Sequence, residues 1–503
     1  MAKIFIEEST LSAIGDSIRA KTGKTNMIPP LNMPTEIASI QAGGSSAPDT
    51  TPFTTNDVTF YDYDGTVVAS YSLEEAQALT SLPDGPTHDG LTFRGWNWSL
   101  SDINTLTGSM NIGAMYITDD GKTRLYIHIA DKARSTVPLY LQQTVVNGVT
   151  IDWGDGSATE TLAGTGNVNT SHAYGVAGDF TISLEVADGC TLVIGNDSSS
   201  YCVIGSTGNA DKVYCNMLQK VEIGIGVTSI RNYTFQNCRS LSSITIPDGV
   251  TSIGSSTFSS CYSLSSITIP DRVTSIGSRA FYSCQSLSSI TIPGGVTSIG
   301  DYAFQNCCSL YSITIPGGVT SIGGSTFSNC YSLSSITIPD RVTSIGSRAF
   351  ENCRSLSSIT IPDGVTSIGT YVFYNCYSLS SITIPDRVTS IGSSAFFSCY
   401  SLSSITIPGG VTSIGNSSFN YCYSLSSITI PDRVTSIGSN AFQDCYCVAE
   451  YHLKSTTPPT LSNKNTFNNI PNDCIIYVPQ GCLEAYQNAT NWSTYESKMQ
   501  EEP

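Results

Sequence analysis

Basic residues, histidine and long apolar runs are all scarce in this 503-residue chain. Lysine and arginine number 23 against 40 acidic residues, which gives a net charge of −17. Such a chain is not expected to bind nucleic acid or an anionic membrane surface, because both carry negative charge and require a basic stripe. No run approaches the ~20 apolar residues of a membrane span, so membrane insertion is not expected either.

Catalytic motifs are also missing. The chain has four histidines, and neither G-x-S-x-G, H-E-x-x-H nor a phosphate-binding loop occurs in it. Carboxylates such as Asp271 and Asp340 recur because they belong to a repeat, where they follow proline as turn residues. A pair of them from different copies stays an open alternative. The sequence otherwise predicts no enzyme, no catalytic residue and no cofactor.

The chain does contain a regular repeat. Cysteine recurs every 23 residues within a nearly constant sequence, at Cys238, Cys261, Cys284, Cys307, Cys330, Cys353, Cys376, Cys399, Cys422 and Cys445. A fixed period of this length is typical of a solenoid, in which each copy forms one coil of a stack.

Short strands and turns are expected in every coil. In one copy Ile267, Thr268 and Ile269 alternate, so that the two isoleucines share one face of a strand. Pro270 ends this strand, and Gly277 permits a further bend. A single coil cannot cover its apolar side chains, whereas neighbouring coils can. Ten coils ~4.8 Å apart predict a rod on the order of 50 Å long.

The repeat L-x-x-I-x-I-P-x-x-V-x-x-I-G-x-x-A-F-x-x-C-x-x resembles the BspA-type leucine-rich repeat almost letter for letter. The resemblance covers roughly Leu218 to Cys447, and it implies a leucine-rich-repeat solenoid over residues 201–447. Residues 448–503 resemble the closing segment of such arrays and are predicted to form a C-terminal cap. Proteins of this family are mostly bacterial surface adhesins and other binding proteins, so the resemblance implies recognition.

The repeat cysteines predict an interior column of reduced thiols. An odd total of 17 cysteines, with one in each coil, argues against a set of disulfides. Equivalent positions in parallel coils point the same way, which is a poor geometry for a bridge, and cysteine behaves as a small buried hydrophobe. Neither Cys307-Cys308 nor Cys445-Tyr446-Cys447 has the spacing of a zinc site, so no metal site is predicted.

A short helical segment is predicted at residues 1–41, with a helix over Leu11 to Lys21 that ends near Gly23. Together with Met33 to Ala38 it resembles a segment of tail proteins of phages and prophages. The resemblance implies attachment to virion tail or baseplate proteins. A marginal amphipathic helix without a partner is the alternative. Residues 42–55, rich in Gly, Ser, Pro and Thr, predict a linker.

Two small β modules are expected between the linker and the solenoid. Residues 56–105 resemble a Listeria-Bacteroides-type repeat, in which Trp96 and Trp98 are expected in the core rather than stacked on a sugar. The segments Val149 to Gly156, Ser171 to Tyr174 and Gly178 to Val186 resemble the polycystic kidney disease (PKD) domain, and the resemblance implies a β-sandwich over residues 106–200. Calcium binding by Asp152, Asp155 and Asp179 stays open beside their roles as turn residues. The fold class is therefore mainly β.

Two columns vary between copies and supply the candidate binding residues, because Tyr and Arg offer large contact areas with polar tips. One follows each cysteine, and the other lies two positions after each glycine. Relaxed, solvent-facing positions are the equal alternative, and an exposed threonine ladder from Thr245 to Thr429 is a further surface. The candidates are Arg239, Tyr262, Arg279, Tyr302, Tyr331, Arg348, Arg354, Tyr371, Tyr377, Tyr400, Tyr423 and Tyr446.

These features predict a phage tail or tail-fibre protein, a virion component whose solenoid binds a host-surface glycan or protein. The N-terminus shows no export signal, which fits a chain made in the host cytoplasm. The first alternative is a BspA-like adhesin at the bacterial cell surface, and the second is a purely structural tail component. Monomer and homo-oligomer both remain open.

Overall fold

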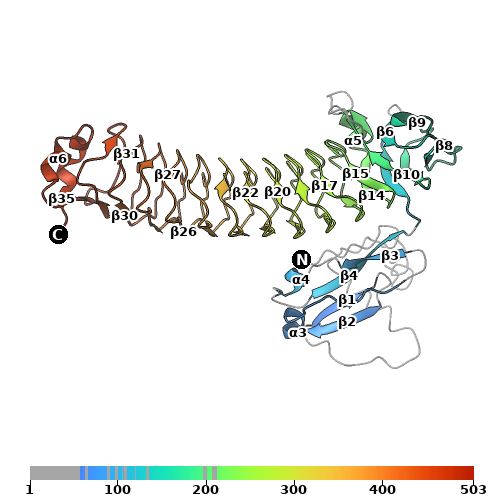
Figure 1. The fold of residues 1–503 in the computed structure, drawn as a ribbon, viewed down its shortest axis with the longest axis horizontal. Coiled ribbons are helices and arrows are strands. Elements are labelled where there is room, and N and C mark those ends of the chain that lie inside the picture. The colour runs from blue at the N-terminus through green and yellow to red at the C-terminus, as the bar shows by residue number, and fades with distance from the viewer. Residues whose placement is uncertain are drawn as a thin grey trace, which may run out of the picture. The chain divides into compact units, whose positions relative to one another are not determined.

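The computed structural model describes residues 57–62, 66–87, 91–96, 100–104, 106, 110–118, 120–131, 135–195, 201–206 and 212–503. The chain divides into two compact units, residues 1–120 and 121–503 (Figure 1). The predicted attachment segment (1–41) and linker (42–55) lie outside the described residues. No helix in the described ranges is long and apolar enough to cross a bilayer.

The first unit is built on a four-stranded sheet in the order β2-β1-β4-β3. A capping box of Ser72 and Glu75 starts α3 and satisfies backbone N–H groups that the helix leaves unpaired. The elements are β1 (Asp57–Tyr61), β2 (Val67–Ser72), α3 (Leu73–Gln77), β3 (Leu91–Trp96), α4 (Leu100–Ile103) and β4 (Met110–Thr118).

Trp96 lies in the core of this unit. It is 5% exposed, its ring centroid is 4.9 Å from that of Phe60, and its indole N–H donates to the carbonyl of Pro83. The expectation of a core role is therefore confirmed for Trp96, while Trp98 lies outside the described residues. Because β4 pairs with β1 and β3, the module expected to end at residue 105 extends to Asp120.

The second unit begins with a β-sandwich. Inward-facing residues such as Leu125, Leu139 and Ile151 are fully buried between its two sheets. The strands are β5 (Thr123–Ile129), β6 (Thr136–Gln143), β7 (Val149–Asp152), β8 (Glu160–Thr161), β9 (Gly166–Ala173), β10 (Gly178–Val186) and β11 (Leu192–Ile194).

Both sheets of the sandwich continue into the solenoid without a break. β14 (Leu218–Glu222) pairs antiparallel with β5, and β16 (Ser243–Thr245) pairs parallel with β14. In the other sheet, β15 (Val227–Ile230) pairs parallel with β11. One hydrophobic core runs through both parts, so the sandwich closes the first end of the stack.

A short connection lies between β11 and β14. It contains the hairpin strands β12 (Tyr201–Cys202) and β13 (Gly205–Ser206) and the helix α5 (Lys212–Cys215). A disulfide joins Cys202 to Cys215, a pairing that the sequence analysis did not anticipate.

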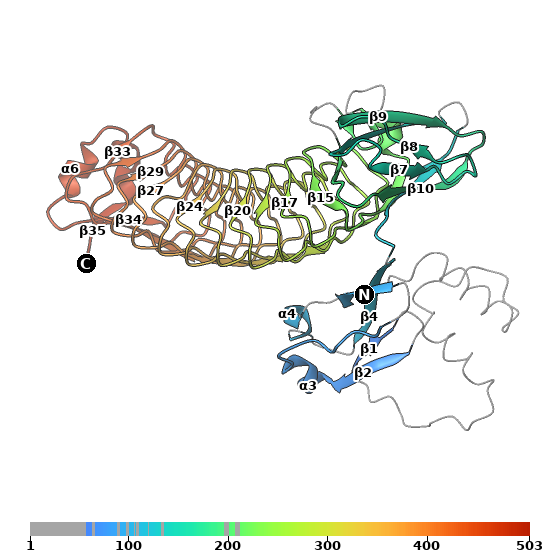
Figure 2. The ribbon, with the colours of Figure 1, turned by 45° about the vertical axis from the view of Figure 1, so that its right-hand side comes forward.

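The solenoid is a stack of successive coils (Figure 2), and their strands pair in parallel with identical register. Ser312, Ile313 and Thr314 of one coil lie opposite the same three residue types of the next coil. The predicted solenoid of 23-residue repeats is thus confirmed. Its strands are β17 (Ser252–Ile253), β18 (Ser275–Ile276), β19 (Ser289–Ile290), β20 (Ser298–Ile299), β21 (Ser312–Thr314), β22 (Ser321–Ile322), β23 (Ser335–Thr337), β24 (Ser344–Ile345), β25 (Ser358–Thr360), β26 (Ser381–Thr383), β27 (Ser390–Ile391), β28 (Ser404–Ile405), β29 (Ser413–Ile414), β30 (Ser427–Ile430) and β31 (Ser436–Ile437).

Identical side chains form ladders inside the stack. Phenylalanine rings from Phe235 to Phe442 stack with centroids 5.2 to 5.6 Å apart. The ten repeat cysteines are buried and unpaired. From Cys261 to Cys445 each thiol donates a hydrogen bond of 3.1 to 3.3 Å to a phenylalanine carbonyl of the neighbouring coil.

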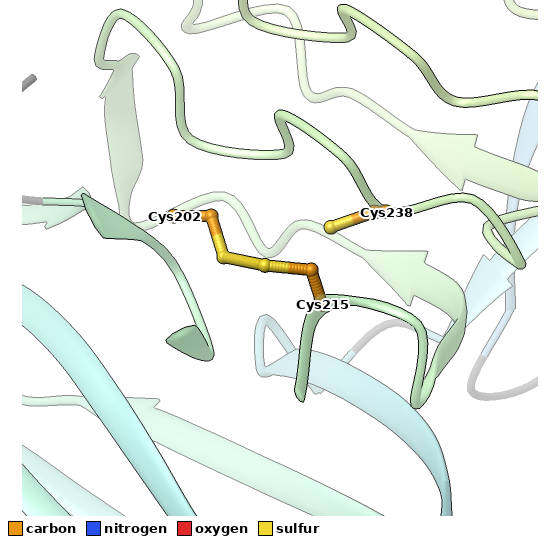
Figure 3. A group of neighbouring side chains, drawn as sticks. All are labelled: Cys202, Cys215 and Cys238. Atoms are coloured by element: carbon orange, nitrogen blue, oxygen red, sulfur yellow. A yellow bond between two sulfur atoms is a disulfide. The ribbon is translucent and has the colours of Figure 1, made fainter. Parts of the chain in front are cut away.

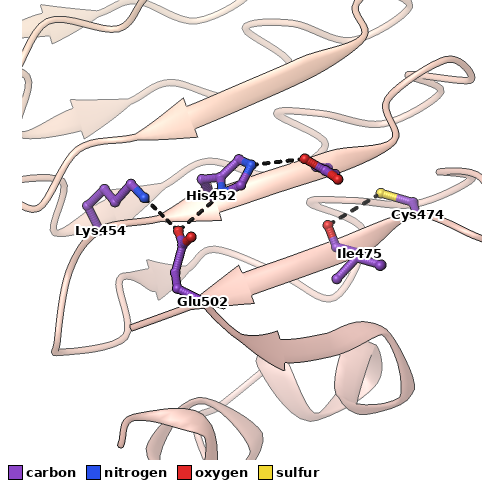
Figure 4. Close-up of polar contacts among 6 residues, drawn as sticks. His452, Lys454, Cys474, Ile475 and Glu502 are labelled. Carbon is purple, nitrogen blue, oxygen red and sulfur yellow. Dashed lines mark hydrogen bonds and ion pairs between the residues drawn. The ribbon is translucent and has the colours of Figure 1, made fainter. Parts of the chain in front are cut away.

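The second end of the stack is closed by the C-terminal residues. β32 (Glu450–Leu453), β33 (Thr460–Leu461), β34 (Ile475–Val478) and β35 (Met499–Glu501) extend the two sheets, and α6 (Leu483–Gln487) and the 3-10 helix η4 (Trp492–Lys498) cover the core. Glu502 accepts from His452 at 3.1 Å and from Lys454 at 2.6 Å, which ties the chain end to β32 (Figure 4).

Candidate functional site

The column that follows each cysteine forms a stacked strip on the solenoid. Tyr377, Tyr400, Tyr423 and Tyr446 stack with centroids 4.8, 4.8 and 5.3 Å apart. The Arg354 guanidinium extends this strip, because it lies over Tyr377 on one side and over Tyr331 on the other, at 5.5 and 4.6 Å. Parallel coils with equal register produce this strip, because they place equivalent side chains one above the other.

The second predicted column occupies a left-handed backbone position. Its residues have φ between 53° and 64°, and they turn their N–H groups toward the next coil: the N–H of Arg348 donates to Thr370, and that of Tyr371 donates to Ser393. Arg348 lies over Tyr371 at 4.9 Å. Serine members such as Ser325 are buried, so the larger members alone offer contact area.

A third variable column, which the sequence analysis missed, joins the other two. The residue after each core phenylalanine is Tyr374 in one coil and Phe397 in the next, and these two rings stack at 4.8 Å. Tyr374 contacts Tyr371, and Phe397 contacts Tyr421, which reaches Tyr423. The signal was available in the sequence, because this position also differs from copy to copy.

We call the connected rings the aromatic patch. They come from four successive coils, and each touches at least one other ring of the set. Its members are Tyr371, Tyr374, Tyr377, Phe397, Tyr400, Tyr421, Tyr423 and Tyr446.

The remaining predicted residues do not join the patch through ring contacts. Arg239 and Tyr262 form a separate pair at 5.1 Å, and Arg279 and Tyr302 form another at 4.6 Å. Tyr331 is connected to the patch only through Arg354. The structure therefore concentrates the candidate surface at the coils nearest the C-terminal cap.

Three phenols of the patch, those of Tyr374, Tyr423 and Tyr446, have a raised pKa. A hydrogen bond of 2.8 Å from the Tyr446 hydroxyl to the Asp444 carboxylate raises the pKa of Tyr446 to about 12. Burial raises the pKa of Tyr374 and of Tyr423 above the ordinary tyrosine value. These three side chains therefore keep neutral hydroxyl groups, and a neutral phenol can both donate and accept hydrogen bonds.

Stacking decides which part of each ring remains available. A tyrosine inside the strip has a neighbouring ring or guanidinium on both faces, which leaves its ring edge and its hydroxyl group for contact with a partner. Tyr446, the last ring of the strip, is 52% exposed. The patch is thus a row of ring edges and hydroxyl groups, a chemistry that suits hydrogen bonding combined with apolar contact.

The sandwich shows no convergence of the three aspartates considered for calcium. Asp152 accepts from the N–H of Gly154, Asp155 accepts from the N–H of Ser157 and contacts His172, and Asp179 contacts His128. Hydrogen bonds to Ser157, and then to His172, hold the pKa of Asp155 well below its usual range. Asp152 and Asp155 order turns, in agreement with the turn roles weighed from the sequence, whereas Asp179 lies in β10 and contacts a histidine instead.

One group of three potential metal ligands occurs among the described residues, and it consists of cysteines. Cys202, Cys215 and Cys238 place their sulfur atoms within 4.8 Å of one another, and all three are buried. No spacing rule for zinc motifs would find it, because the three residues come from the hairpin, from α5 and from the first repeat.

Residues 212–334 and 320–449 match the family described as "BspA type Leucine rich repeat region (6 copies)". Among solved structures, a leucine-rich repeat protein of T. pallidum is 32% identical, with 37% of this chain and 83% of that chain covered and a TM-score of 0.30. A leucine-rich cell surface protein of Faecalibacterium prausnitzii is 31% identical, with 53% and 86% covered and a TM-score of 0.33.

A leucine-rich repeat protein of Bacteroides ovatus is 25% identical to this chain, with 66% of this chain and 98% of that chain covered and a TM-score of 0.34. The low TM-scores mean that the whole chains do not superpose. The relationship is therefore shown by the sequence identity and by the family match. No curated protein matches the chain.

Proposed function

The chain belongs to the BspA-type leucine-rich repeat family, and from this premise we propose that it is a bacterial cell-surface protein that binds a protein partner through its aromatic patch. The observation that carries the proposal is the set of eight connected rings on the variable columns of four neighbouring coils. The core phenylalanine and cysteine positions are the same in every copy, whereas the columns that carry the patch vary from copy to copy, as a recognition surface requires.

The proposed location draws on the F. prausnitzii relative, which is described as a cell surface protein. The relatives support the surface adhesin that the sequence offered as an alternative, and they give no support to a virion component. The phage-tail interpretation rests on residues 11–38 alone, which lie outside the described residues.

A protein partner fits the patch better than a glycan. Sugars bind aromatic side chains through the flat ring faces, and the faces of Tyr400 and Tyr423 are covered by neighbouring rings at 4.8 to 5.3 Å. Ring edges with hydroxyl groups are typical of tyrosine-rich protein interfaces. The patch also has arginines at one end, Arg348 and Arg354, and Asp444 at the other. Such a charge pattern can orient a partner of complementary charge.

We propose no catalytic role. The patch combines phenols of raised pKa with guanidinium groups, and it contains no base within reach of an activated nucleophile.

Two measurements test the proposal. Antibody labelling of intact cells that express the natural gene should give a surface signal that external protease removes, and purified phage particles from the same culture should give none. The purified chain should bind cultured epithelial cells, and treatment of those cells with protease should abolish binding while glycosidases leave it unchanged. A signal on particles, or binding abolished by glycosidases alone, would overturn the respective part of the proposal.

A further inference from the structure

The three clustered cysteines lie where the sandwich meets the solenoid. Cys202 ends β12, Cys215 ends α5, and Cys238 belongs to the first repeat. Each of the three residues is 0% exposed, and their sulfur atoms lie within 4.8 Å of one another (Figure 3). In this structure Cys202 and Cys215 are joined as a disulfide, and the Cys238 thiol faces that pair.

Cys215 is an additional member of the cysteine column. It lies 23 residues before Cys238, and Leu218 follows it at the same spacing as Leu241 follows Cys238. Two successive coils therefore present their cysteine side chains in the same direction. Cys202 approaches both from the hairpin, which lies outside the repeat, and it completes a group that no other coil has among the described residues.

Cys238 differs from the other column cysteines in its hydrogen bonding. The nine thiols from Cys261 to Cys445 each donate to a phenylalanine carbonyl of the preceding coil. No such hydrogen bond is made by Cys238 within the described residues. Its buried sulfur atom instead lies within 4.8 Å of the sulfur atoms of Cys202 and Cys215.

We propose that the reduced form of this cluster binds one soft metal ion, Zn²⁺ or Cu⁺, through the sulfur atoms of Cys202, Cys215 and Cys238. A dithiol reductant supplies two electrons and two protons to the disulfide and is itself oxidised to a disulfide. The three thiols then lose their protons to solvent as three metal–sulfur bonds form. The same three residues thus provide either a disulfide or a metal site.

The chemistry of the ligands selects the ion. Thiolates bind Zn²⁺ and Cu⁺ and do not suit Mg²⁺ or Ca²⁺, which require oxygen ligands. The Cα atoms of Cys202 and Cys215 are 7.1 Å apart, a separation that two thiolates sharing one metal ion can span. With metal–sulfur bonds of ~2.3 Å, sulfur atoms now within 4.8 Å of one another need only small shifts to share an ion.

Binding would fix the hairpin on the first coil. In the oxidised chain the disulfide holds Cys202 against Cys215. In a reducing environment that disulfide is lost. A shared metal ion would replace it, because the ion would join the hairpin to α5 and, in addition, to the first repeat. The end of the stack would then stay closed in both environments.

The test uses the full-length chain, reduced with a dithiol without oxygen and then freed of the reductant. Separate samples receive Zn²⁺ or Cu⁺, and the metal retained after gel filtration is measured by mass spectrometry. We expect about one equivalent of Zn²⁺ or Cu⁺ per chain, and the arm that retains it identifies the ion. Cys202→Ser and Cys238→Ser should each lose that equivalent.

Cys330→Ser is the matched control, since it removes a buried column thiol far from the cluster and should keep the metal. Cys447→Ser removes an exposed cysteine and should also keep it. Cys202 lies outside the repeat, so circular dichroism should show Cys202→Ser to be folded. The proposal is overturned if the reduced chain retains neither ion, if Cys202→Ser retains as much as the original chain, or if the disulfide resists reduction in the folded protein.

Discussion

At the residue scale, one glycine in each coil shows why the repeat is so constant. A Cβ atom on Gly346 would lie 2.5 Å from the backbone nitrogen of Gly324 in the preceding coil. Backbone atoms cannot move aside as a flexible side chain can, so any side chain at this position forces the coils apart. Gly317, in a turn of the same solenoid, has nothing within 4 Å of such an atom. Glycine is therefore a packing requirement at Gly346, whereas at Gly369 in the next coil the nearest atom would lie 3.4 Å from such a Cβ.

We predict opposite effects of two alanine substitutions. Gly346→Ala should lower the free energy of unfolding by about 2–4 kcal/mol, because overlap with backbone must be relieved. Gly317→Ala should leave it unchanged or raise it by up to about 1 kcal/mol, because alanine restricts the unfolded chain. Chemical denaturation of both variants checks this, and equal effects would contradict the account of coil packing.

At the element scale, the sequence predicts what is local and periodic. Alternation of Ile267, Thr268 and Ile269 places two isoleucines inside and one threonine outside, and the structure has them so. The fusion of sandwich and solenoid was not predictable in this way. It depends on pairing between β5 and β14, which are far apart in sequence, and no local pattern marks a long-range partner.

The candidate site was predicted in part for a related reason. Tyr377, Tyr400 and Tyr423 share one column, so period alone placed them in a strip. Tyr374 and Phe397 belong to a third column, and their contacts with the strip depend on the path of the turn between glycine and cysteine. The positions with left-handed backbone that shape this turn cannot be recognised in the sequence, because Arg, Tyr, Ser and Asn all occur there.

The C-terminal cap should weaken in acid. Lys454, and after it His452, lowers the pKa of Glu502 below its ordinary value of 4.5. A lowered pKa in the folded state gives stability that is present above pH 4.5 and is lost as the pH falls through the folded value. The partly exposed ion pair should contribute up to about 1 kcal/mol.

Glu502→Gln tests this expectation at the cap. Its free energy of unfolding should be below that of the original chain at pH 7, and the difference should vanish once the pH falls below the lowered pKa of folded Glu502, because both side chains are then neutral. Glu496→Gln, at an exposed residue that makes none of these contacts, is the control and should have no effect at either pH. A difference that persists in acid would mean that the glutamate acts through packing rather than charge.

At the scale of the whole molecule, the buried thiols make the stack sensitive to base. Burial raises the pKa of the column cysteines from Cys261 to Cys422 above the ordinary value and that of Cys445 to about 12. Above pH 9, the ordinary value, the unfolded chain loses protons that the folded chain keeps, so stability falls as the pH rises. Each buried thiol lowers the free energy of unfolding by about 1.4 kcal/mol for each pH unit above pH 9.

We therefore predict cooperative unfolding of the solenoid within about one pH unit above pH 9, since the summed effect is comparable with the usual stability of a domain. Circular dichroism and thiol reactivity, measured without oxygen, should change together. A variant with Cys330, Cys353 and Cys376 replaced by alanine has three fewer buried thiols to titrate. Its free energy of unfolding should therefore fall less steeply above pH 9 than that of the original chain. Thiols that react in the folded chain at neutral pH would contradict the buried column.

The central claim is that one face of the solenoid, the aromatic patch, carries recognition. The most direct measurement compares the binding of three purified chains to cultured epithelial cells by flow cytometry. These are the original chain, a variant with Tyr377, Tyr400 and Tyr423 replaced by Ser, and a control with Thr337, Thr360 and Thr383 of the exposed threonine ladder replaced by Ser.

Anchoring tyrosines contribute a few kcal/mol to interfaces, so the tyrosine variant should lose at least about tenfold in affinity while remaining folded. The threonine variant should bind as the original does. Unchanged binding by the tyrosine variant, or loss of binding in the threonine variant alone, would contradict the claim.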